Sequence, residues 1–451
     1  MSAMDTRLLL YLALQRALGS HAGARYREFL RWETLTPEAL QQETAARLRA
    51  ALAHAAREIP FYRERVRGAG PELADFPVLT KADVRAHFAA LTHPAHAATR
   101  RYGAIEVKTG GSTGEPTTVI HDAAFRDAGR ASRLYSQRLC GFPFGTPFHR
   151  LWGSMADINQ MRQSPAARLT AWLGRETLWN AFRLSDADCA AFLADLRRRG
   201  ARHVMAYVDA IDQVARYTKT HGGAPALTSI MACAGTVTPD THDRLARVFG
   251  ARVHNKYGSR ECSDLACACA HGGLHVYTPH ALLEIVDDAG APCPPGVTGR
   301  VLVTLTGNAT FPLIRYEIGD LAAWAEPVAC PCGRPFPLLR HIEGRSVEFL
   351  RADDGAYVSP VYIRHLIGVV HNPGALRRFQ LTQHEAARFT LLVEPDPGAA
   401  PGALETARSL IERDLRAVLG AAAHIEWREV DRIPESASGK FLYCLNRSTP
   451  S

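Results

Sequence analysis

The spacing of apolar residues along the chain predicts a change from helices to mixed layers of helices and strands. Within residues 1–57 apolar side chains recur at helical spacing, and Thr36 followed by Pro37 is typical of a helix start. From about residue 100 to 340, short β-branched runs alternate with stretches such as DADCAAFLADLRRRG. This alternation predicts an α/β fold.

Two further regions have patterns of their own. Closely spaced strands separated by Gly, Pro and Asp-Ala-Gly turns fill residues 274–320, which predicts a β-meander or a small barrel. Beyond HIEGRS the sequence predicts a hairpin, a helix ending at Gly420 and a final strand, together a compact α+β unit. We therefore expect a large N-terminal domain over 1–344, with a helical segment over 1–95, and a small C-terminal domain over 345–451.

Composition narrows the class of protein. The 451 residues are 47% hydrophobic and 22% charged, as in ordinary globular proteins. The net charge of +8 comes from scattered arginines without a long basic block, which argues against a nucleic-acid partner. No apolar run reaches the roughly 18 residues of a membrane span, so we expect no membrane partner. The cysteine usage described below leads us to expect a cytoplasmic location. The oligomeric state is left open, with a homodimer as one option.

The loop in KTGGSTGEPTTVIHD, residues 108–122, combines glycines, hydroxyl side chains and a proline. It lacks the Lys-Ser/Thr pair of the P-loop, because Glu115 follows Gly114, and β-branched residues flank it instead of a helix. We expect a loop between two strands whose backbone N–H groups, with the Ser112 and Thr113 hydroxyls, can surround a triphosphate. Taken alone, the same pattern also fits a surface hairpin.

Three other segments carry side chains suited to nucleotide chemistry. In NKYGSRE a tyrosine beside a glycine can stack on a base, and Glu261 can bind Mg²⁺. RYEIGD, expected to end a strand, offers Asp320 as an acceptor for ribose hydroxyls. IPESASGKF places Lys440 on a loop where its ammonium can approach a phosphoryl group. Each segment alone is as consistent with a turn, a cap or an exposed lysine.

In their order along the chain, these segments resemble the adenylate-forming superfamily. The similarity is to the phenylacetate–CoA ligase-like branch with its capsule-biosynthesis relatives, and it includes HAAREIPFYRERV, FPVLTKADVRAHF and IEGRS. It covers roughly residues 45–445. The resemblance implies activation of a carboxylic acid, aryl or short acyl, by ATP and Mg²⁺ to an acyl-adenylate. Transfer to the thiol of coenzyme A or of a carrier-protein phosphopantetheine would follow, with the small domain rotating between the two steps.

The resemblance also implies roles for individual residues. The phosphate loop would consist of Thr109, Gly110, Gly111, Ser112, Thr113 and Gly114. The rest of the nucleotide site would consist of Tyr257, Gly258, Ser259 and Asp320. The catalytic residues would be Lys440, Glu261 and Arg345. The acid pocket would be lined by Trp152, Gly153, Tyr207, Ala234 and Gly235, although the aromatic residues among them could equally be core residues.

Two departures from the family pattern keep alternatives open. Glu115 replaces the usual basic residue before the proline, and Gly235 stands where relatives usually have an acidic residue. The alternatives are an adenylyltransferase that stops at AMP transfer and a catalytically weakened nucleotide-binding protein.

The clustering of the ten cysteines suggests a structural zinc site in a reducing compartment. Three thiolates and one imidazole from CACAHGGLH and CPC would complete a tetrahedral site. The expected ligands are Cys269, His275, Cys330 and Cys332. Cys267 and His271 are alternative ligands, and a set of free thiols is the alternative to any metal.

Overall fold

The structure is a computed structural model of the 451-residue chain. It describes residues 6–447 apart from short gaps, and the statements below concern the described residues. The gaps are 67–69, 100–102, 109–116, 153–163, 182, 236, 238, 288, 344–349, 355–356, 359, 373, 386 and 434–442.

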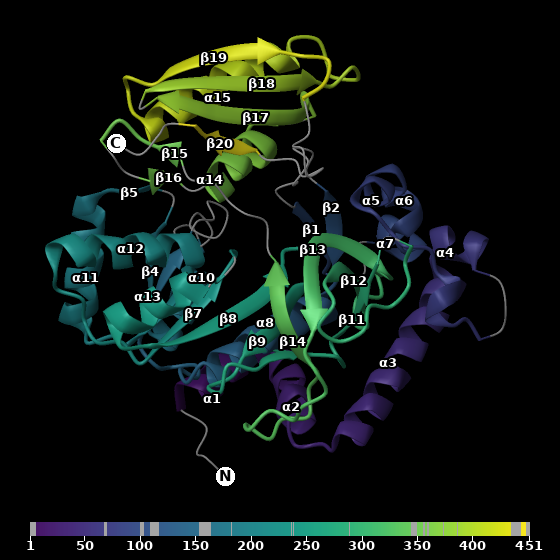
Figure 1. Ribbon diagram of the computed structural model, residues 1–451. Coiled ribbons are helices and arrows are strands. Elements are labelled where there is room, and N and C mark those ends of the chain that lie inside the picture. The colour runs from purple at the N-terminus through teal and green to yellow at the C-terminus, as the bar shows by residue number, and fades with distance from the viewer. Residues whose placement is uncertain are drawn as a thin grey trace.

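Helices form the N-terminal segment, as the apolar spacing predicts (Figure 1). The long helix α3 starts where Thr36 and Pro37 predict it, and Thr36 Oγ1 accepts a hydrogen bond of 3.2 Å from the Ala39 N–H. The helices of this segment are α1 (Thr6–Ala17), α2 (Ala22–Trp32), α3 (Pro37–Glu58), α4 (Pro60–Arg65), η1 (Leu73–Asp75), α5 (Lys81–Ala86), α6 (Phe88–Leu91) and α7 (Pro94–Thr99).

A mixed sheet of eleven strands runs through the large N-terminal part. One half is parallel, in the order β4-β3-β6-β7-β8. Its strands are β3 (Phe148–Trp152), β4 (Glu176–Asn180), β6 (His203–Tyr207), β7 (Ser229–Cys233) and β8 (Arg252–Ser259). The connecting helices are α10 (Pro165–Gly174), α11 (Asp186–Arg199), α12 (Val208–His221) and α13 (Pro239–Phe249).

The other half of the sheet is antiparallel and continues from β8 in the order β9-β10-β14-β13-β12-β11. Its strands are β9 (Ser263–Ala268), β10 (Leu274–Val276), β11 (Ala281–Val286), β12 (Gly299–Leu305), β13 (Tyr316–Trp324) and β14 (Leu338–Glu343). Strands β11 to β14 pair consecutively, so of the two sequence-based options the described strands show the meander. The open order gives no closed barrel among them.

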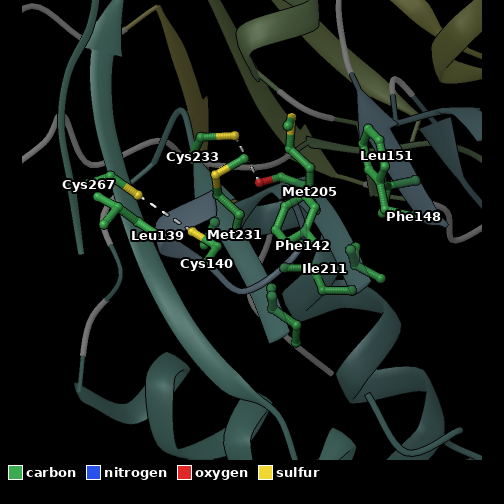
Figure 2. Close-up of a cluster of buried hydrophobic side chains, with 14 of the residues drawn as sticks. Leu139, Cys140, Phe142, Phe148, Leu151, Met205, Ile211, Met231, Cys233 and Cys267 are labelled. Atoms are coloured by element: carbon green, nitrogen blue, oxygen red, sulfur yellow. Dashed lines mark hydrogen bonds between the residues drawn. The ribbon is translucent and has the colours of Figure 1, made fainter. Parts of the chain in front are cut away.

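Helix α8 (Ala123–Leu139) links the sheet to the N-terminal helices. Asp122 caps its N-terminus by accepting a 2.8 Å hydrogen bond from the Phe125 N–H. The helix packs against α2 and β9, and its last residues enter a core that includes Met205 and Met231 (Figure 2). Within the described residues, every helix is too short or too polar to cross a lipid bilayer.

The C-terminal residues form the expected α+β unit, which has its own apolar core (Figure 1). Its sheet has the order β19-β18-β17-β20, and the predicted helix ends at Gly420 with φ 114°. The elements are α14 (Pro360–His365), η2 (Leu366–Val370), β17 (Leu376–Glu385), β18 (Arg388–Pro395), α15 (Ala403–Leu419), β19 (His424–Glu429) and β20 (Cys444–Asn446). A small three-stranded sheet joins this unit to the large part through β15 (Leu350–Arg351), β16 (Tyr357–Val358) and β5 (Arg183–Leu184).

Candidate functional site

The segment YGSRE forms a tight connection between β8 and β9. Gly258 lies opposite Asp264, and Ser259 lies opposite Ser263. A Cβ atom on Gly258 would lie 2.2 Å from the Ser263 carbonyl oxygen, so only glycine allows the two strands to approach this closely. The hairpin thereby fixes the position of Tyr257, the residue expected at the adenine.

Tyr257 and Asp320, two residues expected around the nucleoside, are in contact. The Tyr257 hydroxyl donates a 3.0 Å hydrogen bond to Asp320 Oδ2. Burial, reinforced by the Asp320 charge, raises the pKa of Tyr257 well above its usual range. The phenol therefore stays protonated and remains a donor at neutral pH.

Asp320 does not end a strand, which corrects the expectation from RYEIGD. Strand β13 continues to Trp324, and its register with β12 shifts close to this residue. Gly319 has φ 90°, so a glycine supports an irregularity inside the strand rather than a turn after it. The irregularity lies directly before Asp320.

Glu261, the expected Mg²⁺ ligand, is held between two residues that the sequence did not single out. Its side chain is buried, and Oε1 accepts a 3.2 Å hydrogen bond from the Tyr316 hydroxyl. Its carbonyl oxygen lies 3.0 Å from His121 Nε2. Burial lowers the pKa of His121, so the ring is neutral at pH 7 and can donate to that carbonyl.

His121 also connects Glu261 to the hairpin of the expected phosphate loop. Strands β1 (Ile105–Lys108) and β2 (Thr118–His121) pair antiparallel, with Lys108 opposite Thr118. The prediction that the loop joins two strands is therefore confirmed, although the loop itself lies outside the described residues. The expected positions outside the description are Thr109, Gly110, Gly111, Ser112, Thr113, Gly114, Gly153, Arg345 and Lys440.

The described residues among those expected to line the acid pocket lie at the carboxyl edge of the parallel strands. Trp152 ends β3 and Tyr207 ends β6, and their ring centroids are 4.6 Å apart. Tyr207 is buried and belongs to the core, while Trp152 is partly buried against it. Ala234 follows β7 with φ 59°, an unfavourable conformation for a residue with a Cβ atom, and Gly235 comes next.

The predicted metal ligands form one compact group, here called the thiolate cluster: Cys269, His275, Cys330 and Cys332. Their ligand atoms all lie within 4.8 Å of one another. Cys269 Sγ is 3.5 Å from Cys330 Sγ, and Cys332 Sγ is 3.1 Å from His275 Nε2. A tetrahedral zinc with Zn–S bonds of about 2.3 Å would separate its donors by about 3.8 Å, so the donor types and the approximate spacing of the group suit zinc.

Two glycine-containing turns shape the thiolate cluster. In the β9–β10 connection the Cys269 N–H donates to the Gly273 carbonyl, and in the β13–β14 connection the Gly333 N–H donates to the Cys330 carbonyl. A Cβ atom on Gly273 would lie 2.9 Å from Cys330 Sγ, so glycine leaves the space that the sulfur occupies. The cluster lies beyond the Ala268 end of β9, at the end of the strand remote from Glu261.

Two protein families match separate parts of the chain. The family described as AMP-binding enzyme matches residues 161–311, and the CapK C-terminal domain matches residues 350–447. Phenylacetate-coenzyme A ligase of Thermus thermophilus is 22% identical over 443 residues, covering 92% of this chain and 98% of the relative. Protein CapK of Staphylococcus aureus is 20% identical over 373 residues, covering 82% and 79% of the two chains.

The two family matches and the two relatives together support the phenylacetate–CoA ligase-like/CapK branch of the adenylate-forming proteins. The resemblance drawn from the sequence motifs is thereby confirmed.

Solved structures of 2-hydroxyisobutyryl-CoA ligase share the fold of this protein. The ligase with 2-HIB-AMP and CoA in the thioesterification state gives a TM-score of 0.59 at 21% identity, covering 92% of this chain and 91% of the other. Its postadenylation state with R3-HIB-AMP gives a TM-score of 0.57 at 20% identity, with the same coverage. The predicted α/β class with a separate C-terminal α+β part is confirmed.

Among the described residues, the adenylate-forming fold brings together most of what the motifs predicted for the nucleotide. Tyr257 contacts Asp320, and Glu261 lies on the hairpin that carries Tyr257. Tyr316 and His121 were missed. Tyr316 lies inside RYEIGD, so the motif contained it, whereas no local signal linked His121 to Glu261 over 140 positions.

Proposed function

We propose that this protein uses ATP to convert a carboxylic acid to an acyl-adenylate and then passes the acyl group to a thiol. The observation that carries the proposal is the convergence of Tyr257, Asp320 and Glu261 from β8, β13 and the β8–β9 hairpin. His121 ties this convergence to the hairpin that flanks the glycine-rich loop.

In the first step a carboxylate oxygen attacks the α-phosphorus of ATP and pyrophosphate leaves. Such a step needs alignment of the reactants and neutralisation of phosphate charge more than proton transfer. Glu261 would hold Mg²⁺ while the Tyr316 hydroxyl fixes its carboxylate. Asp320 would accept hydrogen bonds from the ribose hydroxyls. Tyr257 would orient the Asp320 carboxylate and lie against the base.

The remaining roles fall on predicted residues outside the described part of the chain. The loop Thr109–Gly114 would surround the phosphates through its N–H groups and hydroxyls, and Lys440 would bridge the attacking carboxylate and the α-phosphate. Arg345 would act at the hinge between a 1–344 domain and a 345–451 domain. The separate core of the C-terminal unit supports this division.

In the second step a thiolate attacks the acyl carbon and AMP leaves. Coenzyme A is the acceptor we propose first, because a relative that matches 92% of the chain is named as a coenzyme A ligase. A carrier-protein phosphopantetheine presents the same thiol chemistry. Rotation of the C-terminal unit between the steps would have to separate β16 from β5, which pair over only two residues each.

For the acid we propose an aryl or short acyl chain bound beside Trp152 and Tyr207, whose rings meet at the carboxyl edge of the parallel strands. We further propose that the thiolate cluster holds a structural zinc ion. Three sulfurs and one imidazole fill a tetrahedral shell, which leaves no coordination position for a substrate.

Acid-dependent exchange of labelled pyrophosphate into ATP tests the adenylation step. Asp320→Ala should lower kcat/KM for ATP by about 100-fold, because the ribose contact is lost together with the partner of Tyr257. Glu317→Ala is the matched control, since Glu317 lies on the same strand but pairs with Arg300. Equal loss in both variants would contradict the role given to Asp320.

Lys440→Ala, compared with the exposed control Lys219→Ala, tests the proposed catalytic lysine. We expect exchange to fall at least about 100-fold in the first variant and to stay unchanged in the second. AMP release that rises on addition of coenzyme A would establish the second step. Exchange without any thiol-dependent release would favour an adenylyltransferase that stops at AMP transfer.

A further inference from the structure

Strand β8 contributes Lys256 to a buried ion pair. Lys256 directly precedes Tyr257, whose side chain faces the proposed nucleotide site. Successive side chains of a strand point to opposite faces, so Lys256 points away from the face on which Tyr257 reaches Asp320. Lys256 Nζ lies 2.6 Å from Asp264 Oδ1 on β9. The proposed nucleotide site makes no use of this pair.

The strand register places Lys256 in line with the residues of the proposed acid pocket. Leu151, Ala206, Ala232 and Asn255 are neighbours across β3, β6, β7 and β8. One residue further along these parallel strands come Trp152, Tyr207, Cys233 and Lys256. Side chains at one level of neighbouring strands share a face, so Lys256 extends the row that begins with Trp152 and Tyr207.

Lys256 and Asp264 are almost fully withdrawn from solvent. Their side chains are 9% and 11% exposed, and charged residues are rarely so buried without a specific reason. Asp264 Oδ2 has a long contact of 3.4 Å with the Ser136 hydroxyl, which also lies 2.9 Å from the Tyr277 hydroxyl. Within the described part of the chain, Asp264 Oδ1 is the hydrogen-bond acceptor found for the ammonium, which has three hydrogens to donate.

Charged side chains along the row are paired, Lys256 with Asp264 and Arg150 with Glu176 at 2.9 Å. Burial raises the pKa of the Cys233 thiol to about 11, against the opposing charges of Lys256 and Arg133. Cys233 is therefore a neutral neighbour of the pair. Arg150, which also acts on Cys233, lies over the Trp152 ring at 5.4 Å from its centroid.

We infer that Lys256 and Asp264 form a polar subsite of the acid pocket that recognises a hydroxyl group on the substrate, which makes a hydroxy-substituted carboxylic acid the substrate class. This inference rests on the proposed function. The hydroxyl oxygen accepts from the Lys256 ammonium, and its hydrogen is donated to Asp264 Oδ2. One group thus satisfies both members of the pair, and it enters the pocket without adding a charge.

Other substituents match the pair less well. An unsubstituted aryl or alkyl group would leave the spare N–H groups of Lys256 without an acceptor in a buried pocket. A second carboxylate would face Asp264, and an ammonium group would face Lys256. Sites built to bind a hydroxyl reject the analogue that lacks it far more strongly than apolar pockets reject an extra group.

Pyrophosphate exchange with matched pairs of acids tests the inference. The pairs are benzoate with 3- and 4-hydroxybenzoate, phenylacetate with 4-hydroxyphenylacetate, and butyrate with 3-hydroxybutyrate, with succinate and terephthalate as dicarboxylates. We expect kcat/KM for at least one hydroxy acid to exceed that of its parent by at least about tenfold. The inference would be overturned if kcat/KM for every parent acid equalled or exceeded that of its hydroxy acid, or if a dicarboxylate gave the highest kcat/KM.

The double variant Lys256→Met/Asp264→Leu tests whether the ion pair causes the preference for a hydroxy acid. It replaces both charges together by apolar side chains, because removing one partner would leave a buried charge unpaired. The hydroxy-to-parent ratio should fall at least about tenfold in this variant. The ratio should stay unchanged in Arg244→Met/Asp212→Leu, which removes an ion pair between α13 and α12. A ratio that survives in the Lys256/Asp264 variant means that the pair only joins β8 to β9.

Calorimetric binding of the same acids separates this inference from the proposed function. If no acid supports exchange, the proposed function fails, and binding then decides on the subsite. Tighter binding of a hydroxy acid than of its parent, lost in the Lys256/Asp264 variant, would still support the subsite. Binding without that preference, or no binding at all, would overturn it.

Discussion

Two groups of sulfur atoms in this protein have the same spacing and opposite surroundings. In the thiolate cluster Cys269 Sγ and Cys330 Sγ are 3.5 Å apart. Cys140 Sγ and Cys267 Sγ, in the core shown in Figure 2, are also 3.5 Å apart. Distance between sulfurs therefore does not distinguish a metal site from a packed core.

The difference lies in what surrounds each pair. In the thiolate cluster, burial alone would raise the pKa of the Cys332 thiol. Hydrogen bonds from the Arg334 N–H and guanidinium outweigh this effect and lower the pKa. Around Cys140 burial dominates, and the neighbouring Cys267 adds to it, so the pKa of Cys140 is raised well above its usual range. The thiolate cluster combines Cys332 with Cys330, whose pKa burial raises to about 12, and supplies an imidazole. The other pair lies among apolar side chains and favours neutral thiols that pack as small apolar groups.

Among the changes that test this comparison, removal of a proposed zinc ligand should have the largest effect on the protein. Cys332→Ser should reduce bound zinc from about one ion per chain to near zero and lower the apparent melting temperature by roughly 5–10 °C, because metal binding supplies folding free energy. Elemental analysis and differential scanning calorimetry measure the two quantities. Chelation of zinc from the wild-type protein should produce a similar shift.

Cys140→Ser is the matched control for this loss of zinc, because it changes one member of the other close sulfur pair. We expect zinc content to stay at about one ion per chain. Wild-type protein without bound metal, or equal zinc content in Cys332→Ser and wild type, would contradict the proposed metal site.

Crowding one ligand without removing it should have an intermediate effect. In Gly273→Ala the new methyl group would lie 2.9 Å from Cys330 Sγ and 3.4 Å from His275 Nε2. We expect zinc affinity to fall about tenfold, equivalent to about 1.4 kcal/mol, in competition with a chromophoric chelator. Gly307→Ala, whose methyl group would meet no atom within 4 Å, is the control and should keep wild-type affinity.

The two sulfur groups also differ in how far the sequence reveals them. The thiolate cluster comes from two short segments with glycine turns, so local spacing was enough to predict that these four residues come together. The same holds for the hairpin around the phosphate loop and for the helix that ends at Gly420. The contact between Cys140 and Cys267 depends on how the C-terminal end of α8 packs against β9, which no local pattern encodes.

Sequence reasoning failed for the same reason at parts of the candidate active site. Asp320 was found, but the strand was expected to end there, because a glycine before an aspartate is more typical of a turn than of an irregularity inside a strand. Lys256 stands next to Tyr257 in a recognised motif, yet its partner Asp264 becomes its neighbour only through the β8–β9 hairpin. The Lys256–Asp264 pair, which only strand register creates, was therefore missed. Tyr257 and Asp320, also distant in sequence, were both expected, because the family resemblance assigned them to one site.

Shortening a thiol in the packed core should cost less than losing a zinc ligand. Cys140→Ala leaves a small cavity next to Cys267, and we expect the free energy of unfolding to fall by about 1–2 kcal/mol. Urea unfolding monitored by fluorescence measures this change, with zinc content unaltered. A loss as large as that in Cys332→Ser would mean that Cys140 does more than pack.

The smallest expected change is the extent to which Cys140 is alkylated in the folded protein. The thiolate is the reactive form, and both burial and the raised pKa of Cys140 keep its concentration negligible at pH 8. We expect iodoacetamide to leave Cys140 unmodified by peptide mass spectrometry, in conditions that fully alkylate the same cysteine after unfolding in urea. Modification of Cys140 in the folded state at the rate of a free cysteine peptide would show that the core around α8 opens readily. The contrast between a closed thiol core and a thiolate cluster proposed to bind zinc would then no longer hold.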